Sequence, residues 1–302
     1  MELYLRSCST EQIRCLLVIY LNKIVLMNHN FESVNRAFTK QSDHYDIYDA
    51  DNKILHWMRK RVRKHVQQYL KTDDRILELN AGTGLDAFYF AEQGFEVYAT
   101  DLSDGMVHQI QQKISNSNLD SKLKVKQCSY TDLAQLSSEK FNYVFSNFGG
   151  LNCIPNINLV TDHLSILLKP GAIVTFVIMP PVCPWEIAKF FKGKWNEAFR
   201  RLDKNGSMAH LEGEYFKTYY FNPSSVIKAF GKNFVKVKLE GLATFSPPPY
   251  ADYFPSNYPG LYRFLTLLDE NVSLLPPFRS CADHFILTMK YVPNSKSGSI
   301  RK

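Results

Sequence analysis

Between residues 75 and 179 the sequence alternates short apolar runs with amphipathic stretches, and this alternation constrains the fold more than any other feature. Five runs indicate buried strands, because they are largely apolar and are bounded by polar or glycine-containing turns. We expect these strands at 75–80, 96–101, 123–130, 141–148 and 172–179. In most of the segments between these strands, the apolar residues recur every three or four positions, as in an amphipathic helix. Apolar strands joined by helical crossovers predict an α/β fold with a mostly parallel, doubly wound sheet.

After the fifth strand the alternation stops. A short helix over 224–230 and two strands over 234–245 and 283–291 are predicted to extend the sheet. Met27 opens a polar stretch typical of a protein start, so we hypothesise that residues 1–26 are a non-native upstream extension. The expected organisation is an N-terminal extension and lid helix 1–43, a core 44–180, an insertion 181–222, a sheet segment 223–292 with a second insertion 246–280, and a disordered tail 293–302.

Charge and cysteine usage narrow the class of protein. The net charge of +7 over 302 residues is too small to indicate nucleic-acid binding. The basic run 59–64 lies among apolar positions at helical spacing, so we predict that its charges mainly occupy a solvated face. The six cysteines lack CxxC or zinc spacing, which is typical of reduced thiols in a cytoplasmic protein and predicts no metal. The apolar stretch 15–27 is too short to span a bilayer, so no stable membrane insertion is expected.

A glycine-rich turn follows the first strand and opens a helix. Gly82, Gly84 and Ala87 satisfy G-x-G-x-x-A. Glycines let the backbone turn tightly, and the helix N-terminus offers free N–H groups to a ligand. Asp101 ends the second strand, where a carboxylate can accept hydrogen bonds from both hydroxyls of a ribose. Glu78 lies within the first strand, so its carboxylate needs a partner such as a ligand ammonium or a nearby N–H.

These motifs resemble motif I and the following motif of class I S-adenosylmethionine-dependent methyltransferases. The stretches that carry the resemblance are Glu78-x-Asn80-x-Gly82-x-Gly84 and Asp101-x-Ser103-x-x-Met106. Asn80 stands where that family usually has its first glycine. We expect the turn to survive, because asparagine tolerates left-handed backbone better than other non-glycine residues.

The resemblance covers residues 35–180, and later stretches are similar to a subgroup of stand-alone bacterial small-molecule methyltransferases. Residues 141–148 resemble motif IV, whose end lines the active site, and His44-Tyr45-Asp46 resembles a segment that folds over the cofactor. The resemblance implies a seven-stranded Rossmann-like sheet with an antiparallel last strand, and S-adenosyl-L-methionine as cofactor. The cofactor-binding residues that it implies are Tyr45, Glu78, Asn80, Ala81, Gly82, Thr83, Gly84, Asp101, Leu102, Met106, Ser129, Tyr130 and Asn147.

Both insertions are rich in aromatic residues and leave the sheet at the rim where ligands bind, so we predict a helical, aromatic substrate cap. The stretch 189–204 combines aromatic and basic residues in a basic amphipathic helix or helix pair. Three interpretations stay open for it: closure over an apolar, acidic substrate, contact with a membrane surface, or packing on the domain.

The expected reaction is in-line methyl transfer to a small, partly apolar acceptor of acidic or aromatic character. An oxygen or nitrogen nucleophile often also needs a base. The candidates for this base are Glu186, His210 and Tyr250, with Tyr45 and His284 beside them, and none stands in a specific motif.

Two alternative functions are kept. An NAD(P)-dependent oxidoreductase fits G-x-G-x-x-A and the distal acid formally, but that fingerprint normally has glycine at the position of Asn80 and an apolar residue at that of Glu78. The other alternative is a non-catalytic S-adenosylmethionine-binding protein. The acceptor atom and the oligomeric state are left open.

Overall fold

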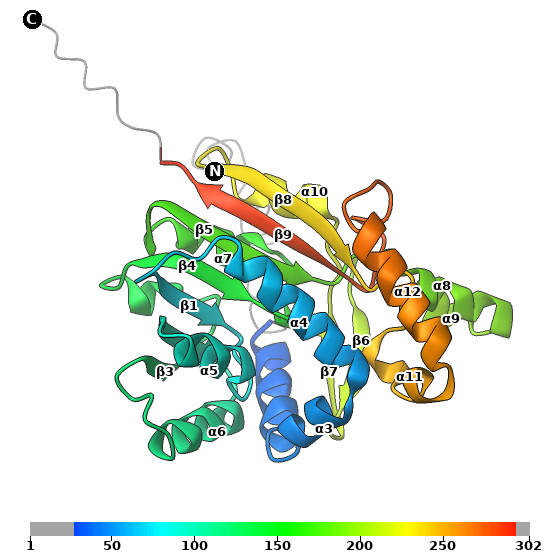
Figure 1. Cartoon of the computed structure of the whole chain (residues 1–302), viewed down its shortest axis with the longest axis horizontal. Helices are drawn as coiled ribbons and strands as arrows, with labels where there is room; N and C mark the ends of the chain where they lie inside the picture. The colour runs from blue at the N-terminus through cyan, green and yellow to red at the C-terminus, as the bar shows by residue number, and fades with distance from the viewer. Residues whose placement is uncertain (1–26, 294–302) are drawn as a thin grey trace, which may run out of the picture.

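The computed structural model describes residues 27–293, which contain a seven-stranded sheet flanked by helices (Figure 1). The strand order is β3-β2-β1-β4-β5-β9-β8. The strands are β1 Arg75–Leu79, β2 Glu96–Asp101, β3 Leu123–Gln127, β4 Phe141–Ser146, β5 Leu168–Ile178, β8 Phe234–Leu242 and β9 His284–Tyr291. Strands β1 to β5 pair in parallel, and β9 pairs antiparallel with both β5 and β8. The predicted doubly wound, Rossmann-like sheet with an antiparallel last strand is therefore confirmed. The hypothesis about residues 1–26 and, apart from residue 293, the expectation for the tail 293–302 concern residues outside the described range.

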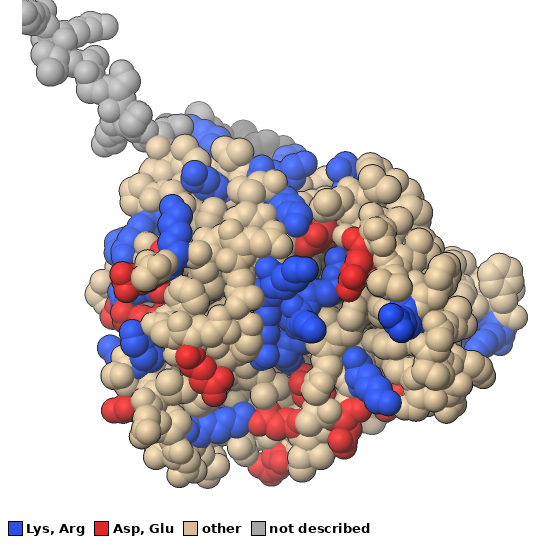
Figure 2. Space-filling view, viewed as in Figure 1, with Lys and Arg blue, Asp and Glu red and all other residues tan. Residues whose placement is uncertain are grey.

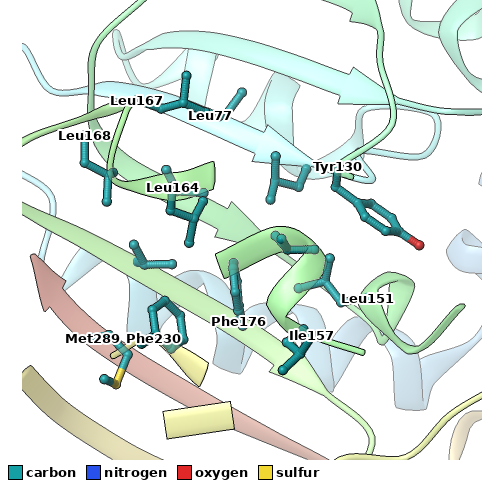
Figure 3. Packing of buried hydrophobic residues seen from close by; sticks show 14 of the residues in the cluster. Leu77, Tyr130, Leu151, Ile157, Leu164, Leu167, Leu168, Phe176, Phe230 and Met289 are labelled. Carbon is teal, nitrogen blue, oxygen red and sulfur yellow. The ribbon is translucent and has the colours of Figure 1, made fainter. Parts of the chain in front are cut away.

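Helices cover both faces of the sheet because successive strand residues point to opposite sides. In β1, Ile76 belongs to a core cluster beneath α4, α5 and α6, whereas Leu77 belongs to a second cluster beneath α7 and α10. Figure 3 shows the second cluster, where the rings of Phe176 and Phe230 lie 5.4 Å apart. The helices are residues 27–41, α3 Tyr45–Asp51, α4 Lys53–Gln67, α5 Leu85–Glu92, α6 Asp104–Ser115, α7 Asn158–Leu164 and α10 Pro223–Ala229.

Helix α4 contains the basic run, in which one arginine departs from the solvated face expected for most of its charges. Its start is capped by Asn52, whose side chain accepts hydrogen bonds from the backbone amides of Ile54 and Leu55. The run does not lie wholly on a solvated face, because Arg59 is buried and forms ion pairs with Asp49 of α3 and Asp86 of α5. The sequence of α4 predicts its apolar face but not the burial of Arg59, because Asp49 and Asp86 belong to other helices.

The two insertions, 181–222 and 246–280, are together called the cap; their helices lie at one end of the molecule, whereas residues 207–218 of the first insertion pack beside the helix 27–41 (Figure 1). The two insertions touch each other, because Trp185 packs against Phe254 and the Lys189 ammonium lies 4.6 Å from the centre of the Tyr250 ring. The first insertion contains α8 Pro184–Ile187, η3 Ala188–Lys192, α9 Trp195–Phe199, η4 Arg200–Leu202, β6 Ser207–Leu211 and β7 Glu214–Thr218. The second contains η5 Pro249–Ala251, α11 Phe254–Asn257 and α12 Pro259–Val272.

The β6–β7 hairpin is not expected from the sequence. Its two strands pair antiparallel around a two-residue turn, Glu212-Gly213. Both turn residues have positive φ, at 50° and 78°, as the tightest hairpin turns require. A glutamate is uncommon in that conformation, so the usual Asn-Gly or Asp-Gly signal is missing.

Candidate active site

A pocket lies at the carboxyl ends of β1, β2 and β4, beneath the helix 27–41 and α3. It is lined by Val34, Phe38, Tyr45, Asn80, Gly82, Asp101, Leu102, Met106, Tyr130, Asn147, Phe148, Gly150 and Cys153. Eight of these are residues that the sequence motifs assign to the cofactor: Tyr45, Asn80, Gly82, Asp101, Leu102, Met106, Tyr130 and Asn147. The other assigned residues, Glu78, Ala81, Thr83, Gly84 and Ser129, are not part of the lining. Among the lining residues, none comes from the cap.

Asp101 closes one side of this pocket with a fixed carboxylate. One oxygen accepts a hydrogen bond from the backbone amide of Gly82 at 2.8 Å, and the other from that of Ser103 at 2.8 Å. Burial raises the pKa of Asp101 to about 6, although these backbone bonds favour the charged form. A carboxylate oxygen offers about two acceptor sites, so each oxygen keeps capacity for a ligand hydroxyl.

The glycine turn survives the replacement of its first glycine. Asn80 adopts a left-handed backbone with φ 47°, and its amide side chain bonds Ser146 and the Asn147 carbonyl at 2.6 and 3.0 Å. A side chain on Gly150 would collide with that amide, so this glycine leaves the room that Asn80 needs. At Gly82, with φ +58°, a Cβ would meet nothing within 4 Å, which shows that this turn faces open space.

The N-terminal helices are fastened over the turn by polar contacts. The Asp46 carboxylate of α3 pairs with the Lys113 ammonium and accepts a hydrogen bond from the Thr83 hydroxyl. Lys113 also donates to the Thr83 carbonyl at 2.8 Å. In the helix 27–41, the Thr39 hydroxyl lies 2.9 Å from that of Ser103. These bonds hold α3 and the helix 27–41 over the pocket.

Glu78 is buried beside the turn with an incomplete set of partners. Within the described residues, its Oε2 atom makes no hydrogen bond. Burial raises the pKa of this carboxyl well above its usual range, and the nearby Asp86 carboxylate raises it further. A buried oxygen without a partner is costly, and a ligand ammonium would satisfy it. The residues present therefore fit a cofactor that carries both ribose hydroxyls and an amino group.

Comparisons with known proteins agree with this geometry. Residues 76–171 match the family model described as a methyltransferase domain. About a third of the chain is therefore similar to a methyltransferase domain. Two of the similar solved structures are complexes with S-adenosylhomocysteine.

Solved structures support the fold of this methyltransferase domain at low sequence identity. One is described as an S-adenosylmethionine-dependent methyltransferase from Listeria monocytogenes, with 20% identity, a TM-score of 0.52, and coverage of 76% of this chain and 95% of that one. Geranyl diphosphate C-methyltransferase from Streptomyces coelicolor A3(2) has 12% identity, a TM-score of 0.51, and coverage of 79% and 80%. Phosphoethanolamine N-methyltransferase 2 from Haemonchus contortus has 15% identity, a TM-score of 0.54, and coverage of 84% and 58%. No curated protein matches the chain in sequence.

A buried charge network supports the wall of this pocket. The Arg59 guanidinium pairs with Asp49 at 2.6 Å and Asp86 at 2.5 Å. The Asn147 amide donates to Asp86 at 2.8 Å, and Arg59 lies 4.7 Å from the centre of the Phe148 ring. The network therefore ties α3, α4 and α5 to the end of β4.

Behind Phe148 lies a histidine that is held in one orientation. The ring centroids of Phe148 and His284 lie 6.1 Å apart, and a Cβ on Gly149 would lie 3.3 Å from His284 Nε2. The other ring nitrogen, Nδ1, lies 2.9 Å from an oxygen of Asp283, and Arg201 donates to the second oxygen at 2.7 Å. Among the contacts of the described chain, no hydrogen bond to Nε2 is found. The antiparallel direction of β9 places its first residue, His284, at the rim where the parallel strands end.

The three residues first named as base candidates lie elsewhere. Glu186 is buried and accepts bonds from Arg200 and Arg201, which hold its pKa below the usual range although burial opposes this. His210 is exposed on β6 and stacks on the Tyr215 ring at 4.5 Å. Tyr250 is half exposed against Lys189. The structure does not bring these three to the pocket, whereas the Asp283-His284 pair at the start of the last strand was a usable sequence signal.

Within the described range, no helix is long and apolar enough to cross a membrane.

Proposed function

We propose that this protein transfers the methyl group of S-adenosylmethionine to a small, partly apolar acceptor. The observation that carries the proposal is the buried Asp101 carboxylate in a pocket closed by the N-terminal helices. Asp101 would hold the ribose hydroxyls, and Glu78 would meet the amino group that its unpaired oxygen requires. When bound, S-adenosylmethionine supplies a methyl group already activated by a sulfonium centre.

The acceptor would enter beside Phe148, Gly149 and His284. This place adjoins the pocket wall and faces the cap, because Arg201 of η4 reaches the Asp283 carboxylate and carbonyl. Asn152 bonds the backbone of both Met179 and Tyr219, where the chain leaves for the cap and returns from it. An acceptor position enclosed by these residues would suit a small molecule better than a polymer.

His284 would accept the proton that an oxygen or nitrogen acceptor loses on methylation. Its Nε2 atom is the free end of a histidine whose Nδ1 is held by Asp283. This arrangement fixes the imidazole tautomer, so that the lone pair lies on Nε2. Asp283 is then a positioning residue, and His284 together with Arg201 holds its pKa well below the usual range against the effect of burial.

Two similar structures support a small acceptor. One contains geranyl diphosphate and the other phosphomonomethylethanolamine, each with S-adenosylhomocysteine. Both compounds are small and acidic, as expected for the acceptor here. The likeness itself establishes only the fold, so the assignment depends on the pocket.

An isotope experiment tests the proposed acceptor class. The purified protein is incubated with S-adenosylmethionine carrying a ¹³C methyl group and with a lysate of its own host. We expect enzyme-dependent label in a low-mass, partly apolar compound. Boiled protein serves as the control for chemical methylation. Label confined to protein or nucleic acid would contradict the small-acceptor proposal.

A further inference from the structure

The outer surface of the cap is unusually apolar. Twenty large hydrophobic side chains are exposed among the described residues, and fourteen of them lie in the cap. Six belong to the first insertion and eight to the second. Such a concentration marks a surface that meets another apolar phase, whereas exposed hydrophobic residues scattered singly need no explanation.

The most exposed part of this surface is a projecting turn, residues 190–196, which we call the aromatic tip. The side chain of Phe191 is 86% exposed and that of Trp195 is 59% exposed. Both rest on Phe190, whose ring centroid lies 5.5 Å from that of Phe191 and 4.3 Å from that of Trp195. Gly193, with φ +72°, reverses the chain between them. The tip therefore presents two large rings on a fixed base.

Basic residues alternate with these rings. Lys192 and Lys194 are both exposed, and no acidic residue lies within the tip. The neighbouring Glu197 is paired with Lys189 at 3.1 Å and Lys194 at 3.0 Å. Within the described chain, no ion pair of Lys192 is found. Figure 2 shows mostly tan atoms over this end of the molecule, with blue atoms beside the projecting tip.

We propose that the aromatic tip binds the surface of an anionic membrane. Tryptophan and phenylalanine partition into the interface between headgroups and acyl chains, and nearby lysines are attracted by anionic lipids. A narrow projection can enter a soft lipid surface, whereas a second protein copy would need a broad complementary face of about 800 Å². The binding is peripheral, and it would place the cap beside partly apolar molecules dissolved in the membrane.

Vesicle sedimentation tests this proposal without any methyl acceptor. The full-length protein is mixed with vesicles of phosphatidylcholine alone, or with vesicles that also contain phosphatidylglycerol. We expect partition onto the anionic vesicles that weakens as salt is raised. The double substitution Phe191→Ser/Trp195→Ser should lower this partition at least about tenfold. Lys192→Gln and Lys194→Gln should each lower it about fivefold.

The matched control is Val235→Thr/Val237→Thr on β8, where the two residues are 55% and 42% exposed and belong to neither insertion of the cap. It should bind vesicles like the unchanged protein. The emission of Trp195 should move to shorter wavelength on anionic vesicles, and Trp195→Phe should abolish that shift while keeping most of the binding. No partition onto anionic vesicles, or equal loss in the control, would overturn the proposal. So would a dimer in solution that the double substitution at the tip dissociates. Because the assay involves no cofactor, its outcome is independent of the proposed methyl transfer.

Discussion

Arg59→Ala is expected to lower the free energy of unfolding by about 3–5 kcal/mol, because it leaves a buried pair of carboxylates without their shared cation. Arg59 is 7% exposed and bridges Asp49 of α3 to Asp86 of α5. Arg63 still pairs with Asp86 after the substitution, but Asp49 loses its ion pair. Urea unfolding followed by circular dichroism measures the effect.

Lys60→Ala is the matched control, because Lys60 is the next residue of the same helix and is exposed. It should change the free energy of unfolding by less than about 0.5 kcal/mol. A loss below about 1 kcal/mol for Arg59→Ala would show that the network is dispensable. The Arg59–Asp49 ion pair would then not be what holds α3 beside the pocket.

His284→Gln is expected to slow methyl transfer about 10²- to 10⁴-fold, the usual contribution of a general base. The affinity for S-adenosylhomocysteine should stay unchanged, because His284 does not line the cofactor pocket. The acceptor found by the isotope experiment is the substrate for this measurement. Asp283→Asn should give a smaller loss of rate, since it weakens the hold on the imidazole but leaves the imidazole in place.

His210→Gln is the matched control, because that histidine is exposed on the hairpin. Its rate should equal that of the unchanged protein. Unaltered turnover in a folded His284→Gln variant would mean that the acceptor loses no proton to this residue. A parallel loss of cofactor affinity would instead indicate a structural role for His284.

The sheet could be predicted from the sequence because its signals are local. Apolar runs bounded by turns mark each parallel strand, and Glu96–Asp101 has the predicted bounds in the structure. The glycine turn and Asp101 lie within 20 residues of each other along the chain, so their spacing could be interpreted without knowledge of the tertiary fold. The Ser103 cap of α6 is equally local, and its side chain accepts from the Met106 amide.

The buried ion pairs and the position of His284 could not be predicted, because they depend on residues that are distant in the sequence. Arg59 is buried only because Asp49 and Asp86 converge on it from other elements. His284 reaches the pocket wall only because β9 runs antiparallel to β5. The ion pair of Glu186 with Arg201 likewise joins two short helices whose packing has no periodic pattern. Sequence spacing cannot reveal such contacts, so it predicts neither the ion pairs of Glu186 nor the burial of Arg59.

The most direct test of the central claim is a calorimetric titration of S-adenosylhomocysteine and of NADH into the full-length protein. We predict binding of S-adenosylhomocysteine alone, with affinity that falls as the pH drops below 6, because the hydroxyl-accepting carboxylate of Asp101 has a pKa of about 6. Asp101→Ala should weaken this binding by about 1.5–3 kcal/mol, or roughly 10- to 100-fold. Binding of NADH in place of S-adenosylhomocysteine, or unchanged affinity in a folded Asp101→Ala variant, would contradict the account.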